Sequence, residues 1–431
     1  MVPELPRRFS AQEDAARPRL ARTPEARLEE AVGLADAIDL ETVHAEVIPV
    51  AEPRPATLLG SGRISGLAQI VAETDAELLI VDHPLTPVQQ RNLETELKCK
   101  VLDRTGIILE IFGRRARTRE GVLQVDLAHL NYQKGRLVRS WTHLERQRGG
   151  AGFLGGPGET QIEADRRLLQ EKIVRLERDL EQVRRTRDLH RAKRKKVPYP
   201  VVAIVGYTNA GKSTLFNRMT GSEVLAEDML FATLDPTLRR VRLPHGTIVI
   251  LSDTVGFISD LPTHLVAAFR ATLEEVVEAD LIVHLRDISD PDAAAQAEDV
   301  EAILADLGVA AGDRDRMIEV WNKVDLLEGG DRVRLLDDAA SRDGSQPMGI
   351  SATTGEGIDT LLTVIEEKIA GVLETVEILV PADRLSLIDW VYRNSQVVTR
   401  TDREDGSVEL VIRATQAARD EIAGRLSRQG D

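Results

Sequence analysis

The segment from residue 201 to residue 219 constrains the fold more than any other part of the chain. Val201 to Val205 is an apolar run typical of a buried strand, and Thr214 to Met219 has the composition of a helix. The residues between them fit the pattern GxxxxGK[ST]: Gly206, Tyr207, Thr208, Asn209, Ala210, Gly211, Lys212 and Ser213. A strand, this loop and a helix together predict a phosphate-binding P-loop in a doubly wound α/β domain with a mostly parallel sheet.

The chemistry of this loop follows from its backbone and two side chains. Backbone N–H groups of the loop and of the helix start, as far as Thr214, can face the β-phosphate of a nucleotide. Lys212 can bridge β- and γ-phosphate oxygens, which makes it a candidate catalytic residue, and the Ser213 hydroxyl can ligate Mg²⁺. We therefore expect a nucleoside triphosphate bound with Mg²⁺.

Two later segments predict that the base is guanine. Asn322, Lys323, Val324 and Asp325 follow the strand-like run 318–321. A buried Asp325 carboxylate can accept two hydrogen bonds from guanine, and adenine has no donors there. The Lys323 stem can lie along the base. Further on, Ser351, Ala352 and Thr353 follow the last strand-like run, where the Ala352 N–H would meet guanine O6.

The γ-phosphate side is predicted from two segments between these motifs. Asp253, Thr254, Val255 and Gly256 follow the run 248–251. Asp253 would reach Mg²⁺ through a water, and the Gly256 N–H would contact the γ-phosphate. A switch segment is expected at Phe231, Ala232, Thr233, Leu234 and Asp235, with Thr233 as the Mg²⁺ ligand and Thr237 as the alternative.

Hydrolysis without a partner is predicted to be slow. Phe257 stands where many GTPases place a glutamine that orients the attacking water, and a phenylalanine cannot do so. Asn209 is a candidate catalytic residue that could partly compensate for Phe257, because its amide can hold K⁺ against the phosphates in place of an arginine finger. The competing interpretation is that Asn209 only makes loop hydrogen bonds.

The charge distribution predicts an RNA-binding part within an acidic protein. The net charge is −15, yet residues 111–196 hold 22 lysines and arginines against 11 acidic residues. Heptad spacing of apolar residues on both sides of the glycine-rich segment 149–158 predicts an antiparallel helical hairpin with a loop at its tip. A solvated spacer is the alternative, but an excess of arginine suits phosphate backbones. The expected RNA contacts are Gly155, Gly156, Arg146, Arg148, Arg114, Arg115, Lys195 and Lys196.

The remaining segments complete the predicted organisation. We expect a flexible N-terminus (1–28), an α/β subdomain (29–115), the hairpin (116–196), the GTPase domain (197–373) and an α+β domain (374–431). In the α/β subdomain, the turn Gly60-Ser61-Gly62 could hold a second nucleotide, but a plain loop is the better interpretation. A single cysteine, Cys99, fits a reducing cytosol, and no charge-free run exceeds 15 residues, which predicts no membrane span. We expect a cytoplasmic monomer.

Several motifs resemble one branch of the translation-factor-related GTPases. The segments 102–106 (LDRTG), 155–163 (GGPGETQIE) and 231–237 (FATLDPT), with the nucleotide motifs, look like the HflX-type GTPases over residues 30 to 431. The resemblance implies binding to the large ribosomal subunit and splitting or rescue of stalled ribosomes, with the hairpin tip near the peptidyl-transferase region. One departure is Thr353, where the family usually has lysine.

The sequence is compatible with three functions. The first is a GTPase that splits or rescues ribosomes and leaves after hydrolysis. The second is a nucleotide-gated RNA-binding or ribosome-assembly scaffold with little functional hydrolysis. The third, an adaptor at membranes or proteases, lacks an amphipathic basic helix or a lipidation signal in the sequence.

Overall fold

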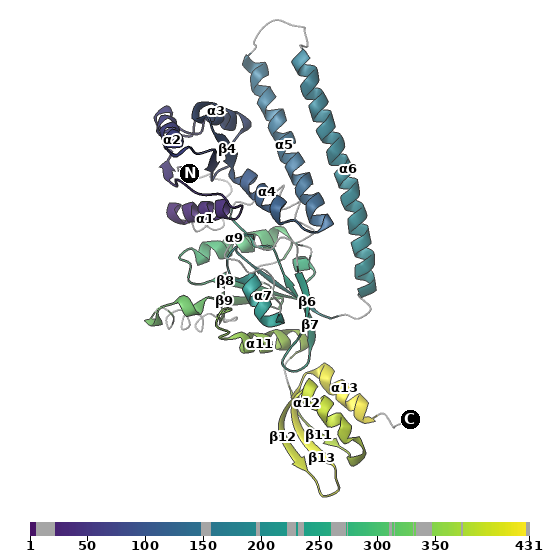
Figure 1. Ribbon diagram of the computed structural model, residues 1–431. Coiled ribbons are helices and arrows are strands. Elements are labelled where there is room, and N and C mark those ends of the chain that lie inside the picture. Colours follow the sequence, from purple (N-terminus) through teal and green to yellow (C-terminus); the bar gives the residue numbers. More distant parts are fainter. Residues whose placement is uncertain are drawn as a thin grey trace.

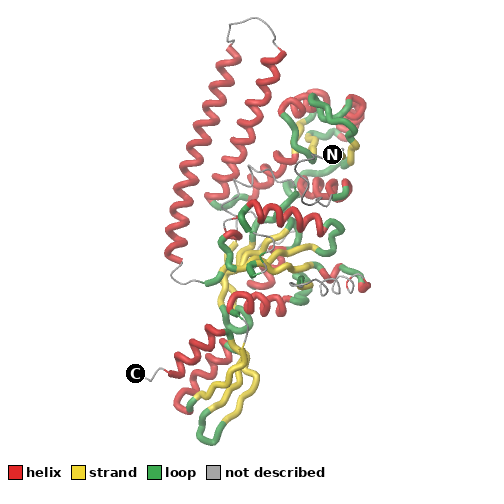
Figure 2. The backbone as a smooth tube through the Cα atoms, turned by 180° about the vertical axis from the view of Figure 1, so that it is seen from behind, coloured by secondary structure: helices red, strands yellow, loops and turns green. Residues whose placement is uncertain are grey.

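The computed structural model describes residues 1–5, 22–147, 157–194, 199–221, 230–231, 237–259, 273, 275–309, 313, 315–330, 332, 347–371 and 374–427. Four parts follow one another along the chain (Figure 1). An N-terminal α/β part lies beside two long helices, a sheet with helices on both faces occupies the middle, and a small α+β part lies at the opposite end of the molecule (Figures 1 and 2). This confirms the predicted fold class, while the exact domain boundaries stay predictions. The expectation of a flexible N-terminus is wrong for residues 2–4, because they pair with residues 47–49 in a small sheet, and for residues 24–28, which begin a helix.

The N-terminal part contains two small parallel sheets, β1–β2 and β3–β4. Its elements are β1 (Val2–Glu4), α1 (Pro24–Asp36), β2 (Val47–Pro49), α2 (Ser61–Thr74), β3 (Leu78–Val81), α3 (Pro87–Leu97), β4 (Lys100–Asp103) and α4 (Arg104–Arg115). Local chemistry explains where the helices begin. Thr86 and Gln89 form a reciprocal capping box before α3, and Asp103 accepts a hydrogen bond from the Gly106 N–H at the start of α4.

The predicted hairpin consists of α5 (Arg119–Gln147) and α6 (Pro157–Arg194), which lie side by side in both views (Figures 1 and 2). The heptad residues Ile173 and Leu180 of α6 are buried, as the pattern predicts. Among the α5 residues whose side chains are described, the most buried apolar ones are instead Val125 and Ala128, which belong to the same core cluster as α4. The base of α5 therefore packs on two sides, against α6 and against the N-terminal part.

The central sheet has six strands in the order β10-β9-β8-β5-β7-β6. The strands are β5 (Val201–Gly206), β6 (Thr237–Arg242), β7 (Ile248–Asp253), β8 (Leu281–Asp287), β9 (Met317–Asn322) and β10 (Met348–Gly349). All neighbours are parallel except β6 and β7. Central β5 is buried on both faces, which explains its unbroken apolar run. The sequence did not predict β6, which is antiparallel and carries exposed arginines at the sheet edge.

Helices cover both faces of this sheet. One face packs against α7 (Lys212–Thr220) and α11 (Ile358–Ala370). The other packs against α9 (Ala293–Asp306) and, in the same continuous core, against α1, α4 and the base of α5. The N-terminal part is thus joined to the nucleotide-binding sheet by shared apolar burial, which is the dominant favourable term in association.

The C-terminal part is a three-stranded antiparallel sheet in the order β11-β13-β12 with helices packed on one face. Its elements are β11 (Glu374–Val380), a 3₁₀ helix η2 (Ala382–Leu387), α12 (Ile388–Asn394), β12 (Gln396–Asp402), β13 (Val408–Ala414) and α13 (Gln416–Ser427). Gly406 has φ +79° in the β12–β13 turn, where the sequence predicted a hairpin. Across the described parts of the chain, no helix is long and apolar enough to cross a bilayer.

Candidate nucleotide-binding site

The predicted P-loop connects the end of β5 to the start of α7. Gly206 has no room for a side chain, since an added Cβ would lie 2.2 Å from the Leu285 carbonyl oxygen of the next strand. Asn209 and Gly211 have φ values of +60° and +90°, so the loop turns through two left-handed positions before the helix begins. Such a turn directs backbone N–H groups into one concavity, which is the arrangement that phosphate oxygens require.

Lys212 is the buried cation of this loop. Its side chain is almost fully buried, and Nζ donates a hydrogen bond of 2.6 Å to the Tyr207 carbonyl. Burial lowers the pKa of Lys212 to about 8, although the nearby Asp253 carboxylate acts in the opposite direction. An added Cβ on Gly256 would lie 3.0 Å from Nζ, so the loop after β7 and the P-loop meet at this ammonium group.

Ser213 and Asp253 lie together, as a Mg²⁺ site requires. The Ser213 hydroxyl donates to Asp253 Oδ2 at 2.8 Å, and Asp253 is fully buried at the end of β7. Thr254 fixes this end of the strand, because its hydroxyl donates to the Ile204 carbonyl at 2.6 Å. A hydroxyl and a carboxylate oxygen beside a phosphate loop are the donors that Mg²⁺ prefers, so these residues fit the ion.

The segment after Gly256 is paired with the P-loop. The Phe257 N–H donates to the Gly206 carbonyl, and the Thr208 N–H donates to the Phe257 carbonyl. The Phe257 ring is buried in the core shared with the N-terminal part, and Val255 is in the same cluster. Phe257 is therefore a core residue, and its side chain has no means of orienting water.

Asn322 joins the two sides of the expected base pocket. Its Nδ2 donates to the Ala210 carbonyl at 2.8 Å, and its Oδ1 accepts a hydrogen bond from the Ala352 N–H at 2.9 Å. One buried amide thus links the P-loop, the segment 322–325 and the segment 351–353. In the last segment, Arg218 of α7 donates to the Thr353 carbonyl at 2.9 Å.

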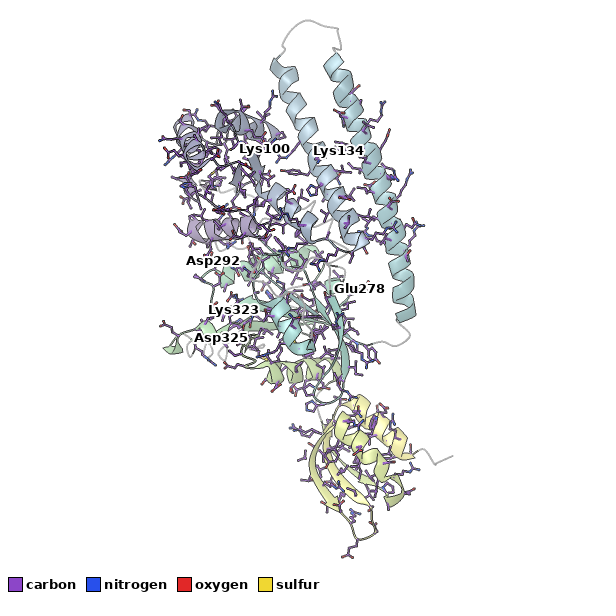
Figure 3. All side chains as sticks on the ribbon, in the orientation of Figure 1. Lys100, Lys134, Glu278, Asp292, Lys323 and Asp325 are labelled. Atoms are coloured by element: carbon purple, nitrogen blue, oxygen red, sulfur yellow. The ribbon has the colours of Figure 1, made fainter. Side chains whose placement is uncertain are left out.

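Asp325 differs from its expected state. It lies in the short 3₁₀ helix η1 (Val324–Leu326), next to Lys323 (Figure 3), and its side chain is exposed, whereas Val324 beside it is buried. The expectation of a buried carboxylate is wrong for the protein alone, because η1 is a surface turn that leaves this side chain facing outward. The desolvation that makes base selection strong would have to come from the bound base itself.

The switch segment is described only in part. Residues 232–236, and with them the predicted Mg²⁺ ligand Thr233 and the predicted nucleotide contacts Ala232, Leu234 and Asp235, lie outside the described residues. Thr237, the alternative ligand, begins β6 opposite Asp253 in the antiparallel register. Phe231, also predicted to bind nucleotide, is buried and packs edge-on against Phe112 of α4, with ring centroids 4.8 Å apart.

A buried charged cluster that sequence reasoning missed joins the site to the N-terminal part. Glu30 of α1 binds Arg104 at 2.6 Å and Arg22 at 2.5 Å, and it accepts a hydrogen bond from the Tyr207 hydroxyl. Arg104 also donates to the Ser259 carbonyl at 3.0 Å, and the Ser259 N–H donates to the Tyr207 hydroxyl at 2.9 Å. We call these five residues the junction; Ser259 lies three residues beyond Gly256.

Burial and neighbouring charges set the protonation states of Glu30 and Tyr207 in the junction. Burial alone would raise the pKa of Glu30, but Arg104, Arg22 and the Tyr207 hydroxyl hold it below its usual value, so the carboxylate is ionised. Burial and the Glu30 charge together raise the pKa of Tyr207, which keeps its hydroxyl protonated as a donor. The pairing of Glu30 with Arg104, 74 residues apart in the chain, has no local sequence signal.

The predicted RNA contacts are mostly beyond what the structure describes. Arg114, at the end of α4, forms an exposed ion pair of 2.9 Å with Asp39, and Arg115 follows it. Arg146 belongs to α5, but its side chain is not described. Arg148, Gly155, Gly156, Lys195 and Lys196 lie outside the described residues.

Comparison with known proteins finds matches along most of the chain. Four family models match in succession: "GTP-binding GTPase N-terminal" (25–113), "GTP-binding GTPase Middle Region" (115–194), "50S ribosome-binding GTPase" (201–323) and "HflX C-terminal domain" (335–430). The GTPase HflX of Magnetococcus marinus is 47% identical over 403 residues, covering 94% of this chain and 91% of its own. That of Escherichia coli is 44% identical over 362 residues, covering 84% and 83%.

A GTP-binding protein from the archaeon Sulfolobus solfataricus, in complex with GDP, is 21% identical with a TM-score of 0.43, covering 79% of this chain and 94% of that chain.

Proposed function

Because this chain belongs to the HflX family of GTPases and is therefore a GTP hydrolase, we propose that it binds the large ribosomal subunit and splits or rescues stalled ribosomes, with hydrolysis driving its release. The observation that carries the proposal is the direct contact between the nucleotide loops and the part that bears the basic hairpin. Tyr207 and Ser259, one from each loop, are the junction residues that contact Glu30 and Arg104 of the N-terminal part. The family model that matches residues 201–323 is described as a 50S ribosome-binding GTPase, which favours the ribosome as the partner.

The nucleotide roles follow from the site. Lys212 would neutralise the β- and γ-phosphates, the P-loop N–H groups would bind the β-phosphate, and Gly256 would contact the γ-phosphate. Ser213, with Thr233 or Thr237, would hold Mg²⁺ directly, and Asp253 through a water; the ion would neutralise charge that develops on the phosphates. Asp325 would pair with guanine. Asn209, exposed in its left-handed turn, would hold K⁺.

A short chain of contacts connects hydrolysis to the hairpin. Arg104 of the junction begins α4, and the neighbouring Asp103 caps that helix. Asp103 also accepts a hydrogen bond of 2.6 Å from the Tyr132 hydroxyl and forms an ion pair of 2.6 Å with Arg136, both on α5. A change at Ser259 after γ-phosphate release would reach α5 through two adjacent residues, which is a route to a different RNA affinity.

Sedimentation tests the ribosome as partner. Ribosomes are centrifuged through sucrose with the protein and either GDP or a non-hydrolysable GTP analogue. Co-sedimentation with the large subunit, and loss of intact ribosomes, is expected with the analogue only. Intact ribosomes carrying the protein equally in both nucleotide states would contradict the proposal.

Phosphate release distinguishes the alternative. A nucleotide-gated RNA-binding or assembly scaffold would bind with GTP but show no acceleration of hydrolysis on ribosomes. The proposed cycle expects a large stimulation by the large subunit, of the order of 10³ or more, because Phe257 leaves the attacking water without an orienting side chain.

A further inference from the structure

Asp287 lies at the base side of the nucleotide site although no motif includes it. It is the last residue of β8, and its register partner on β9 is Asn322, which directly precedes Lys323. Its Oδ2 forms an ion pair of 2.7 Å with Lys323 Nζ. The Asp287 side chain is 13% exposed and that of Lys323 31% exposed, so the pair is partly shielded from solvent.

Asp287 is held in place by its own surroundings. Its Oδ1 accepts hydrogen bonds from the Ser289 N–H at 3.0 Å and from the Ser289 hydroxyl at 2.6 Å. The intervening Ile288 N–H donates to the Asn322 carbonyl at 3.1 Å, which extends the β8–β9 ladder by one bond. One carboxylate oxygen is thus used to fix the turn, and the other is directed at Lys323.

The direction of the Lys323 side chain is set by the ion pair with Asp287 rather than by its own backbone. Its backbone is left-handed, with φ +65°, and the flanking Asn322 and Val324 are buried and fixed. A lysine stem has several rotatable bonds, so its direction is not set by the backbone. Tying the ammonium group to Asp287 restricts the stem to rotamers that run from the end of β9 to the end of β8.

We propose that Asp287 is a positioning residue for guanine recognition, acting through Lys323. The inference rests on the proposed function, in which the Lys323 stem forms one wall of the base pocket. Asp287→Asn should weaken the binding of GDP and GTP by the same factor, roughly threefold to fivefold for a partly exposed ion pair. KM for GTP should rise accordingly, while kcat should stay unchanged, because the pair does not contact the phosphates.

Titration of fluorescently labelled GDP and of a labelled non-hydrolysable GTP analogue measures this effect. The proteins are the full chain, Asp287→Asn, Lys323→Met and the double variant. The matched control is Asp306→Asn, which removes an exposed carboxylate at the far end of α9. The single variants should weaken both nucleotides, the control should equal the parent, and Asp287→Asn should have no further effect in the Lys323→Met background.

Three results would overturn the assignment: unchanged affinity in Asp287→Asn, an effect on the GTP analogue alone, or an equal loss with and without Lys323. Asparagine keeps an oxygen for the Ser289 turn, and circular dichroism checks that the variant is folded. Should that variant not fold, Lys323→Arg decides, because a guanidinium can keep the ion pair and should retain most of the affinity lost in Lys323→Met. A parent protein that binds neither nucleotide would refute the proposed function instead, which separates the two failures.

Discussion

Replacing Arg104 with methionine should destabilise the N-terminal part around α4 and remove its contact with Ser259. Arg104 is 4% exposed and pairs with Glu30 and Asp82, whose side chains are 5% and 2% exposed. Methionine has a similar length and no charge, so the packing of α4 is largely kept. The main consequence is that two buried carboxylates lose a shared cation.

The expected cost follows from what each carboxylate retains. Breaking a buried ion pair by removing one partner costs about 3–5 kcal/mol. Glu30 keeps Arg22 at 2.5 Å, and Asp82 keeps Arg27 at 2.9 Å, which places the expected cost at the lower end, about 3 kcal/mol. That is a large fraction of the roughly 5–15 kcal/mol that holds a typical domain folded.

Hydrogen exchange of the α4 amides is the appropriate assay, because a multidomain chain has no single free energy of unfolding. Residues 107–109 and 111 of α4 are fully buried, and their exchange reports local opening. A loss of about 3 kcal/mol corresponds to roughly 100-fold faster exchange. The control is Arg114→Met on the same helix, whose ion pair with Asp39 is exposed and worth about 0–1 kcal/mol.

Equal exchange in the two variants would refute the reasoning, because it would mean that burial adds nothing to the ion pair. Acid supplies an independent check. The pKa of Glu30 is lowered by its partners, so its contribution to stability is complete above its unfolded value of about 4.3 and is lost as the pH falls through its lower folded value. The acid-induced loss should therefore be smaller in Arg104→Met than in the parent.

Four further predictions concern the residues of the nucleotide site. Burial lowers the pKa of Lys212 to about 8, so the Kd for GTP should rise by roughly tenfold per pH unit above pH 8; a flat profile to pH 9.5 would contradict this. In the nucleotide-free protein the free energy of unfolding should rise with pH between about pH 8 and pH 10.4. In that range the unfolded state still binds the Lys212 proton and the folded state has lost it. Asp325→Asn should weaken the binding of GDP by about 2–3 kcal/mol, measured by calorimetry. It should favour the binding of xanthosine diphosphate, whose base has an acceptor where guanine has a donor. Unchanged GDP affinity would exclude Asp325 from base recognition. K⁺ should accelerate phosphate release relative to Na⁺, and Asn209→Ala should abolish the difference; equal rates in the two salts would remove the role of Asn209.

Local signals in the sequence predicted most of the sheet and the loops that follow its strands. The run Val201 to Val205 and the motif after it specify β5, its loop and α7, because each step depends on neighbouring residues. The heptads likewise predicted the hairpin. Strand β6 was missed because Thr237–Arg242 has exposed arginines at the sheet edge, where an apolar run is not needed.

Contacts between distant segments could not be predicted in this way. Phe231 reads as part of a switch segment, yet its ring is in the core because Phe112, from a helix more than 100 residues earlier, packs against it. The junction is a similar case: the tyrosine at a variable position of the P-loop motif carries the hydroxyl that meets Glu30. A motif specifies the backbone conformation at such a position but not the side chain, which can therefore contact a neighbouring domain.

The geometry of α5 explains why a small change at the junction would be amplified at the far end of the hairpin, where we propose that RNA binds. The helix has 29 residues, which at 1.5 Å per residue gives a rod of about 43 Å. Tyr132 and Arg136, which bind Asp103, lie within its first two-thirds, and Val125 and Ala128 fix its base in the shared core. A rotation of about 5° at that base would displace the far end by roughly 4 Å, about the separation of two hydrogen-bonded strands. Because apolar packing resists continuous deformation, such a rotation is expected between two discrete arrangements. If either side moved alone, the hydrogen bonds that join Tyr207 to Glu30 and Ser259 to Arg104 would be lost. These contacts would therefore make the nucleotide loops and the base of the hairpin change together.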